Sequence, residues 1–230
     1  MTTLSLDTAT PAPSLALLTE GEVLLERNLP ATPGAGRRLA HELHLLIAEA
    51  GLPLSAVGEI VVGVGPGGFT GLRIGIATAL GLGQALRIPV VGVASIEALA
   101  CGMAREAPAG SLVVPVIDAK RNEIFAAAYR FTDTGLDVVV EPLATTASGL
   151  AERLAAATTP DCPAWLAGDG LHRVAGILGA GIVAAPEGSP AHAISAVQLA
   201  RRARTGGARP VRPGSPRRLS RTGSRGSASW

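Results

Sequence analysis

The sequence predicts an α/β protein of two lobes, in which the second lobe repeats the order of elements of the first. Two observations support this fold class. Short apolar, β-branched runs alternate with longer segments of helical periodicity, which is typical of α/β proteins. In addition, each half of the chain opens with three strand-like segments, and only afterwards do helices and strands alternate. We therefore expect duplicated βββαβα units.

The elements of the first lobe follow from turn and cap residues. Glu20-Gly21 joins two strand-like runs into a hairpin, and Gly51 ends a helix as its C-cap. The apolar β-branched run at 60–64 is typical of a strand buried on both faces of a parallel sheet. The predicted strands are 4–8, 14–19, 22–28, 60–64 and 90–93, and the predicted helices are 37–50, 72–86 and 95–103.

The second lobe begins after the cluster Pro108-Ala109-Gly110, which indicates a boundary between an N-terminal lobe at 1–104 and a C-terminal lobe at 105–204. Residues 205–230 are rich in Arg, Pro, Ser and Gly, and they are predicted to be a disordered tail without any packed element. The predicted strands of this lobe are 112–117, 123–131, 137–140, 164–167 and 182–184, and its predicted helices are 146–157, 171–178 and 190–204.

The charge of the chain is concentrated in the tail. Residues 205–230 hold six of the 20 basic residues and no acid, which leaves 14 basic against 18 acidic residues, or −4, for residues 1–204. A body of that sign is a poor electrostatic match for nucleic acid, so any role with RNA is expected to run through a partner.

The cysteines and the N-terminal residues indicate the cellular compartment of the protein. Cys101 and Cys162 lie in unrelated contexts without metal-ligand spacing, so reduced, buried thiols are predicted. The start of the chain lacks a basic region followed by an apolar run, and no stretch approaches the ~20 apolar residues of a membrane span. A cytoplasmic protein without membrane contact is expected.

A glycine-rich stretch between a strand and a helix is the most informative motif. Gly65, Gly67 and Gly68 can turn backbone amides toward one point, ahead of a helix that begins near Thr70 and carries Arg73. This geometry suits an anion. However, the stretch lacks the Lys-Ser/Thr ending of a P-loop and the spacing of a dinucleotide fingerprint, so a simple tight turn remains an alternative.

Two helices carry surfaces that could meet a neighbour. In the helix 72–86, small residues recur every four positions at Gly71, Gly75, Ala79 and Gly83, and this stripe predicts a close approach either by the protein's own sheet or by a partner's helix. The helix 37–50 has a second, weakly polar line beside its core face. That line consists of His41, His44, Leu45 and Ala48. The two histidines have no third ligand nearby, so no metal site is expected.

The order of elements resembles the actin/hexokinase/Hsp70 (ASKHA) architecture, in which a nucleotide sits between the lobes. Three motifs are more specific and resemble the TsaB (YeaZ) family. They are Leu6-Asp7-Thr8-Ala9-Thr10, the segment from Gly65-Pro66-Gly67-Gly68-Phe69-Thr70-Gly71-Leu72-Arg73-Ile74-Gly75, and Asp118-Ala119-Lys120-Arg121-Asn122-Glu123-Ile124-Phe125.

This resemblance implies a non-catalytic subunit of the machinery that makes threonylcarbamoyladenosine next to the anticodon of ANN-decoding tRNAs. It implies a heterodimer with the catalytic paralogue TsaD, an association with the TsaE ATPase, a possible homodimer when the chain is alone, only indirect contact with tRNA, and no cofactor. The family pairs through its first two long helices. The residues implied here are His41, His44, Leu45, Ala48, Leu72, Gly75, Ile76, Ala79, Leu80 and Gly83.

The resemblance also implies that the catalytic site has degenerated. Ser95 and Leu99 stand where TsaD has two metal-binding histidines, and neither can replace imidazole. Ala9 replaces a glycine of nucleotide-binding relatives, and Gly168-Asp169-Gly170 is a faint trace of an adenosine loop. A vestigial nucleotide or anion loop is expected at Asp7, Gly65, Gly67, Gly68, Thr70 and Arg73.

Two enzymatic alternatives stay open. The first is an ASKHA-type small-molecule kinase or phosphotransferase that uses Asp7 together with Asp118 as acid or base. The second is a glycoprotease, although the sequence lacks a Ser/His/Asp constellation or a metal-ligand set at recognisable spacing. We expect the chain not to be an enzyme by itself.

Overall fold

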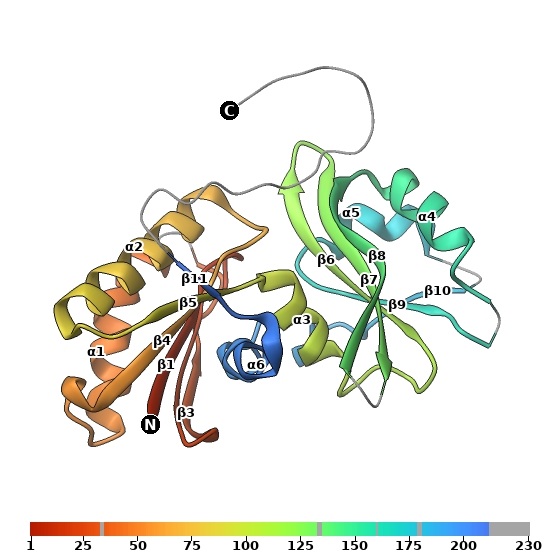
Figure 1. Cartoon of the computed structure of the whole chain (residues 1–230). Helices are drawn as coiled ribbons and strands as arrows, with labels where there is room; N and C mark the ends of the chain where they lie inside the picture. The colour runs from red at the N-terminus through yellow and green to blue at the C-terminus, as the bar shows by residue number, and fades with distance from the viewer. Residues whose placement is uncertain (33–34, 133–134, 160, 179–180, 212–230) are drawn as a thin grey trace.

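The structure is a computed structural model that describes residues 1–32, 35–132, 135–159, 161–178 and 181–211. Two sheets lie side by side, each at the centre of one lobe, and helices α3 and α6 lie between them (Figure 1).

The first sheet combines antiparallel and parallel pairs. Its first strand pairs antiparallel with the second and parallel with the fourth, which places the chain's beginning in the middle of the sheet. The strands of this lobe are β1 (Thr2–Asp7), β2 (Ser14–Thr19), β3 (Glu22–Asn28), β4 (Val57–Gly63) and β5 (Val90–Val93). Its helices are α1 (Leu39–Glu49), α2 (Phe69–Leu86) and α3 (Ser95–Met103), with short 3-10 turns at Ala35–Arg38 and Leu54–Ala56.

The second lobe repeats this arrangement. Three antiparallel strands are followed by a helix and a strand that returns parallel to the first of the three. The elements are β6 (Leu112–Lys120), β7 (Glu123–Thr132), β8 (Gly135–Thr145), α4 (Ala147–Ala155), β9 (Ala164–Ala167), α5 (Leu171–Val174), a 3-10 turn at Ala175–Ile177 and β10 (Ile182–Ala184). The strand orders β3-β2-β1-β4-β5 and β8-β7-β6-β9-β10 correspond, so the predicted α/β fold with a duplicated order of elements is confirmed.

Each face of the first sheet is covered by different helices. Because side chains alternate along a strand, Leu15 and Leu17 face α1 and α2, whereas Ala16 and Leu18 face the opposite side. The side of Leu15 is the larger core, which includes Leu4, Leu6, Leu39, Leu43, Leu46, Ile60 and Val62. On the side of Ala16, the contacts come from α6 (Ala196–Arg202).

The two lobes share a core through α3. Leu99 and Met103 of this helix are completely buried in one cluster with Ala127 and Tyr129 of β7. The Tyr129 hydroxyl is buried without a hydrogen-bond partner in the described part of the chain, and burial raises its pKa above the usual range. The lobes are therefore joined by packed apolar side chains.

The end of the second lobe differs from the prediction of one helix over 190–204. The chain forms a 3-10 turn at Pro190–His192, becomes extended at Ala193, and starts α6 only after Ser195. The Ser195 hydroxyl accepts a hydrogen bond from the Gln198 amide, so this residue acts as an N-cap. In addition, α6 packs on β1 and β2 of the first sheet, although the predicted division placed it with the second lobe.

The prediction that no packed element follows Thr205 is wrong for residues 205–211. A π-helical turn at Ala203–Gly207 leads into the short strand β11 (Arg209–Pro210), which pairs antiparallel with β5 at the edge of the first sheet. The Val211 amide donates to the Val90 carbonyl at 3.1 Å, and the Val211 side chain joins the core under α2. Residues 212–230 lie outside the described residues.

Two further predictions concern cysteines and membranes. Both cysteines are free and half-buried, whereas the sequence predicted buried thiols, and burial raises the pKa of Cys101. In the part of the chain that the structure describes, none of the helices is both long enough and apolar enough to cross a bilayer.

Candidate functional site

A buried carboxylate stands at the end of the first strand. Asp7 is 1% exposed, and its two oxygens are both engaged: Oδ1 accepts from the Ala9 amide at 2.7 Å, and Oδ2 accepts from the Ser95 hydroxyl at 2.6 Å. The Ser95 oxygen in turn accepts from the Gly65 amide at 3.1 Å. Three segments distant in sequence, the end of β1, the glycine-rich loop and the start of α3, are thereby joined.

The glycine-rich loop is pressed against the end of β1. The Gly68 amide donates to the Ala9 carbonyl at 2.7 Å. A Cβ on Gly67 would lie 2.4 Å from that same carbonyl oxygen, and one on Gly63 would lie 1.7 Å from Asp7 Oδ2. Glycine is therefore required here because the chain's own backbone and the Asp7 carboxylate come too close for a side chain.

The predicted loop residues are only partly brought together. Asp7, Gly65, Gly67 and Gly68 meet as described, and the amides of Gly65 and Gly68 are already bonded to the chain itself. Arg73 points elsewhere, because its guanidinium carbon lies 3.7 Å from the centroid of the exposed Phe69 ring. Thr70 is exposed at the first turn of α2.

The electrostatics of Asp7 are dominated by burial. Removal from water raises the pKa of this carboxyl, while the hydrogen bonds from Ser95 and Ala9 lower it. The Asp7 carboxyl is stabilised by two uncharged donors, Ser95 and Ala9, which fix it in one orientation. Because both oxygens accept hydrogen bonds from the protein, Asp7 connects the end of β1 to the start of α3.

The corresponding acid of the second lobe is Asp118. Like Asp7, it accepts from the amide two residues further on, here that of Lys120 at 2.9 Å. Its carboxylate also accepts from the Lys120 ammonium at 2.7 Å and from Arg173 Nε at 3.2 Å. Burial alone would raise its pKa, but these donors hold the pKa of Asp118 at about 2. A carboxylate with that pKa is a weak general base.

The Gly168-Asp169-Gly170 segment packs on β6. A Cβ on Gly168 would lie 2.0 Å from the Val116 carbonyl oxygen, so this glycine permits a close backbone approach. The Asp169 carboxylate accepts from the Asp118 amide at 3.1 Å, and burial raises the pKa of Asp169. These contacts lock β9 to the end of β6.

Ser95 and Leu99, which the sequence resemblance matched to metal-binding histidines, are fully buried. Ser95 is committed to Asp7, and Leu99 packs in the core shared by the lobes. Among the described residues there is no group of three or more His, Cys, Asp or Glu side chains placed to hold a metal ion. Ser95 and Leu99 therefore serve the connection of α3 to both lobes.

The small-residue stripe of α2 faces the protein's own sheet. A Cβ on Gly71 would lie 2.2 Å from the Thr8 carbonyl oxygen, and one on Gly75 would lie 2.2 Å from the Thr8 hydroxyl. A Cβ on Gly83 would likewise come too close to the Val90 side chain. Ala79 is completely buried. Leu72, Gly75, Ala79 and Gly83 were predicted to contact a partner, and this prediction is wrong because they pack inside the lobe.

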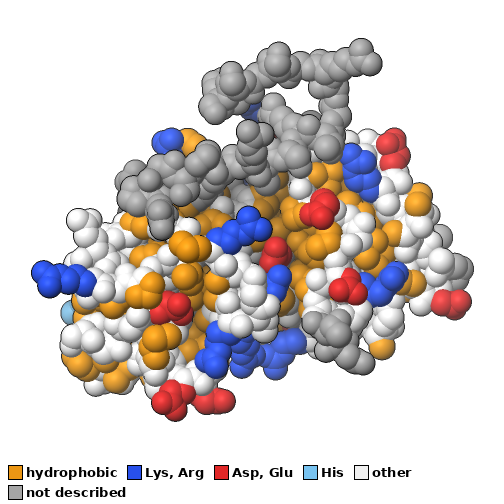
Figure 2. Space-filling view, in the orientation of Figure 1, with side chains coloured by type: hydrophobic (Ala, Val, Ile, Leu, Met, Phe, Trp, Pro, Cys, Tyr) orange, Lys and Arg blue, Asp and Glu red, His pale blue; other side chains and the backbone are white. Residues whose placement is uncertain are grey.

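The outward faces of α1 and α2 are accessible. His41, His44, Leu45 and Ala48 of α1 are exposed, as predicted, while Ile76 and Leu80 of α2 are half-buried. Sequence reasoning missed an exposed row on the side of α2 opposite to the stripe, spaced four residues apart, which consists of Phe69, Arg73, Ala77 and Gly81. The signal was present, because a row two positions from a buried stripe lies about 200° around the helix and is exposed. Hydrophobic side chains are visible over this lobe in Figure 2.

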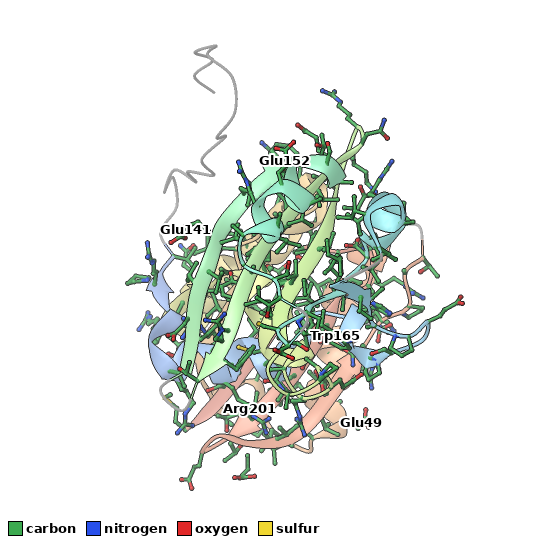
Figure 3. All side chains as sticks on the ribbon, turned by 90° about the vertical axis from the view of Figure 1, so that its right-hand side faces the viewer. Glu49, Glu141, Glu152, Trp165 and Arg201 are labelled. Atoms are coloured by element: carbon green, nitrogen blue, oxygen red, sulfur yellow. The ribbon has the colours of Figure 1, made fainter. Side chains whose placement is uncertain are left out.

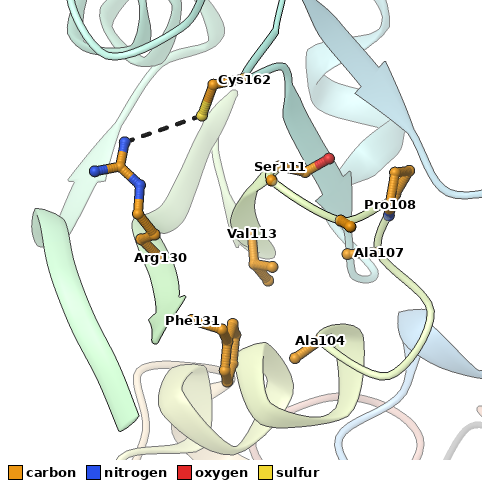
Figure 4. Close-up of a pocket in the computed structure, with 10 residues that line it drawn as sticks. Ala104, Ala107, Pro108, Ser111, Val113, Arg130, Phe131 and Cys162 are labelled. Carbon is orange, nitrogen blue, oxygen red and sulfur yellow. Dashed lines mark hydrogen bonds between the residues drawn. The ribbon is translucent and has the colours of Figure 1, made fainter. Parts of the chain in front are cut away.

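A pocket of about 490 Å³ lies in the second lobe (Figure 4). Arg130 is the one charged residue among those that line it, and its guanidinium lies 3.9 Å from the Cys162 sulfur. The remaining lining is mostly apolar, with Val113, Phe131, Ala104, Ala107 and Pro108. The Ser111 hydroxyl is buried without a partner among the described residues. This lining holds no pair of acid and base.

Comparison with known families gives one extended match. The family model described as "TsaD: tRNA N6-adenosine threonylcarbamoyltransferase" matches residues 36–161. This segment includes α1, the glycine-rich loop, α2 and the Asp118 turn.

The chain is similar to several individual proteins. It is 38% identical over 130 residues to an uncharacterized protein of Mycobacterium tuberculosis, covering 56% of this chain and 59% of the relative. It is 32% identical over 140 residues to the tRNA threonylcarbamoyladenosine biosynthesis protein TsaB of Bacillus subtilis, covering 61% of this chain and 60% of the relative. The chain thus spans less than two thirds of the length of the curated relatives it matches.

A solved structure extends the similarity to nearly the whole fold. YeaZ from Pseudomonas aeruginosa is 30% identical, with a TM-score of 0.71, and the match covers 88% of this chain and 91% of that one. The two-lobed fold is therefore shared with YeaZ.

Proposed function

Because the chain belongs to the TsaB/YeaZ family, we propose that it is a non-catalytic subunit in the biosynthesis of threonylcarbamoyladenosine in tRNA. Its task is to bind a TsaD-like catalytic subunit and hold that subunit in its working arrangement. The modified adenosine is the one next to the anticodon of ANN-decoding tRNAs. The tRNA is contacted chiefly by the partner, since the body of this chain is net acidic.

The observation that most strongly supports this proposal is that the polar groups at the end of β1 are hydrogen-bonded within the chain. The Gly68 amide is bonded to the Ala9 carbonyl, and both Asp7 oxygens are bonded to protein donors. A phosphate would have to displace these internal bonds to use the same groups. With Ser95 and Leu99 in place of metal-binding histidines, the chain supports binding of a partner better than it supports phosphoryl or carbamoyl transfer.

The proposed pairing surface is the outward face of α1 and α2. On α1 it comprises the four exposed residues predicted from the sequence, and on α2 it moves from the buried stripe to the opposite, exposed row with Ala77 and Gly81. Small residues in that row allow a partner's helix to approach closely, and Phe69 supplies an exposed aromatic anchor. A self-associated dimer through the same face is expected when the partner is absent.

The proposal extends to a larger assembly that includes a TsaE-like ATPase. A phosphotransferase activity of the isolated chain is the competing function, and the low pKa of Asp118 and the closed environment of Asp7 speak against it. The two functions separate in one experiment. The chain is mixed with the TsaD-like and TsaE-like proteins of its own organism, and transfer of labelled threonylcarbamoyl to tRNA is measured with and without each component.

We expect transfer to require the chain together with its TsaD-like partner, with no ATP consumption by the chain alone. Phosphate transfer to a small acceptor by the isolated chain, or full modification activity without it, would overturn the proposal.

A further inference from the structure

The turn between β6 and β7 has a rare backbone conformation. Lys120 pairs with Glu123 at the ends of the two strands, so Arg121 and Asn122 form a two-residue loop. Lys120, Arg121 and Asn122 all have positive φ, at 65°, 51° and 63°. Tight hairpin loops often need positive φ, which glycine and asparagine adopt readily and long side chains adopt at a cost. Asn122 therefore suits its position, whereas Lys120 and Arg121 are strained.

Two of these three side chains have partners within the chain. Lys120 Nζ donates to the Asp118 carboxylate at 2.7 Å, and Asn122 Oδ1 accepts from Arg173 Nη1 at 3.1 Å. The Asp118 carboxylate also accepts from the Lys120 amide at 2.9 Å and from Arg173 Nε at 3.2 Å. These bonds hold the turn from both ends, so its unfavourable backbone conformation persists.

Arg121 is the exception. Its side chain is exposed and forms neither a hydrogen bond nor an ion pair with the described residues. The Asp118 carboxylate is already occupied by Lys120 and Arg173, and the half-buried Glu123 forms no ion pair with Arg121. Glycine would meet the needs of the turn at a lower cost. A strained arginine without a partner among the described residues points to a partner outside the chain.

The position of the turn suits contact with a large molecule. Figure 1 shows the turn as the upper tip of the second lobe, and in Figure 3 Arg201 of α6 lies toward the opposite end of the protein. The turn also lies outside the proposed pairing surface on α1 and α2. Because a hairpin tip projects beyond its sheet, Arg121 can reach a polyanion while the net acidic body stays at a distance.

We propose that Arg121 contacts a backbone phosphate of the tRNA bound to the assembled complex. This inference rests on the proposed function, which makes RNA the substrate, and it adds a contact made by this chain itself. A guanidinium donates two parallel N–H bonds to phosphate oxygens and needs no particular base. The turn is already held by Asp118 and Arg173, so little backbone freedom is lost when the phosphate binds.

Two arginines with left-handed backbone provide a matched test. Arg121→Gly removes the side chain and relieves the backbone strain. Arg87→Gly is the control, because Arg87 is also exposed, has a φ of 57° and ends α2. Neither variant should melt below the wild-type temperature, since glycine adopts positive φ freely. Each variant is combined with the TsaD-like subunit, and the mass of the heterodimer is measured by light scattering.

The tRNA affinity of each heterodimer is then measured by filter binding from about 50 to about 200 mM KCl, the range over which phosphate contacts weaken strongly. Arg121→Gly should weaken binding about five- to tenfold and reduce the slope of log affinity against log salt by about one, the value for one lost phosphate contact. Arg87→Gly should leave the affinity and the slope unchanged.

The outcomes separate this inference from the proposed function. An intact heterodimer of Arg121→Gly with wild-type tRNA affinity and salt slope would overturn the inference and leave the proposed function standing. A weakened heterodimer with an unchanged tRNA slope would overturn it as well, because Arg121 would then contact a carboxylate of the partner protein. If the wild-type chain forms no heterodimer, the proposed function fails and the inference fails with it.

Discussion

The Ser95 hydroxyl donates to the Asp7 carboxylate, with 2.6 Å between the two oxygens, and so joins the first turn of α3 to the end of β1. The sequence resemblance matched Ser95 to a metal-ligand position of TsaD. Here the same position anchors the acid of the first strand instead.

Replacing Asp7 by Asn tests whether this acid is structural. The asparagine oxygen can still accept from Ala9, and its NH₂ can donate to Ser95, so we expect the free energy of unfolding at pH 7 to change by less than about 1 kcal/mol. Modification activity of the reconstituted complex should stay unchanged. A loss of activity in a folded Asp7→Asn complex would indicate a chemical role.

The pH dependence of the same variant follows from the raised pKa of Asp7. The folded state holds this proton more tightly than the unfolded state, whose pKa is about 3.9. The stability contributed by Asp7 is therefore present below about pH 4 and is lost as the pH rises through the folded pKa. Urea denaturation of wild type and Asp7→Asn from pH 4 to 8 should show wild type losing stability relative to the variant. A constant difference would contradict the account.

Asp118 should behave in the opposite way. Its pKa is lowered to about 2 in the folded state, so its contribution is present above about pH 4 and is lost as the pH falls from about 4 to about 2. Asp118→Asn should reduce the free energy of unfolding at pH 7 by roughly 1–2 kcal/mol, because Lys120 and Arg173 lose a charged acceptor. The difference from wild type should shrink in denaturation curves recorded near pH 2, and a difference that persists there would contradict this assignment.

Two glycines of α2 provide a matched pair. Gly81→Ala should raise the free energy of unfolding by about 0.5–1 kcal/mol, since its Cβ would meet nothing within 4 Å and alanine favours a helix. Gly75→Ala should lower the free energy of unfolding, because its Cβ would lie 2.2 Å from the Thr8 hydroxyl. Denaturation of the two variants under one condition compares them directly. Equal changes in the free energy of unfolding would contradict this account, because they would mean that α2 does not turn Gly75 toward the sheet and Gly81 toward solvent.

The packing of β11 at the edge of the first sheet indicates that Val211 stabilises the fold. This side chain packs against Gly92, where an added Cβ would come within 2.8 Å of it, and its amide bonds to Val90. Val211→Asp should lower the free energy of unfolding by about 1–2 kcal/mol through burial of a charge at the sheet edge. Hydrogen exchange should find the Val211 amide protected. Rapid exchange of this amide would show that the strand does not form in solution.

Much of the fold could be predicted because local signals and the global arrangement agree. The strands at Ser14–Thr19 and Glu22–Asn28 are leucine-containing runs on either side of the Glu20-Gly21 turn, and their limits match the prediction. The helix Ser95–Met103 matches too. The prediction of a continuous helix over 190–204 failed because helical composition continues through Ser195, whose side chain favours a new N-cap.

The site could be predicted less completely because orientation is a tertiary property. The stripe of Gly75, Ala79 and Gly83 indicated close approach, but spacing alone cannot distinguish the protein's own sheet from a partner's helix. The packing of Val211 on β5 was missed for a similar reason, since two residues in a polar, arginine-rich stretch carry no periodic signal. The engagement of Asp7 by Ser95 joins residues that no local pattern connects.

The most direct test of the proposed function is the mass of the complex formed with the TsaD-like subunit, measured by size exclusion with light scattering. Ala77→Glu places a charge on the exposed row of α2, and Ala155→Glu places the same charge on an exposed helical alanine of the second lobe. We predict a heterodimer with wild type and with Ala155→Glu, and separate subunits with folded Ala77→Glu. A heterodimer that persists with Ala77→Glu, or the absence of any complex with wild type, would contradict the account.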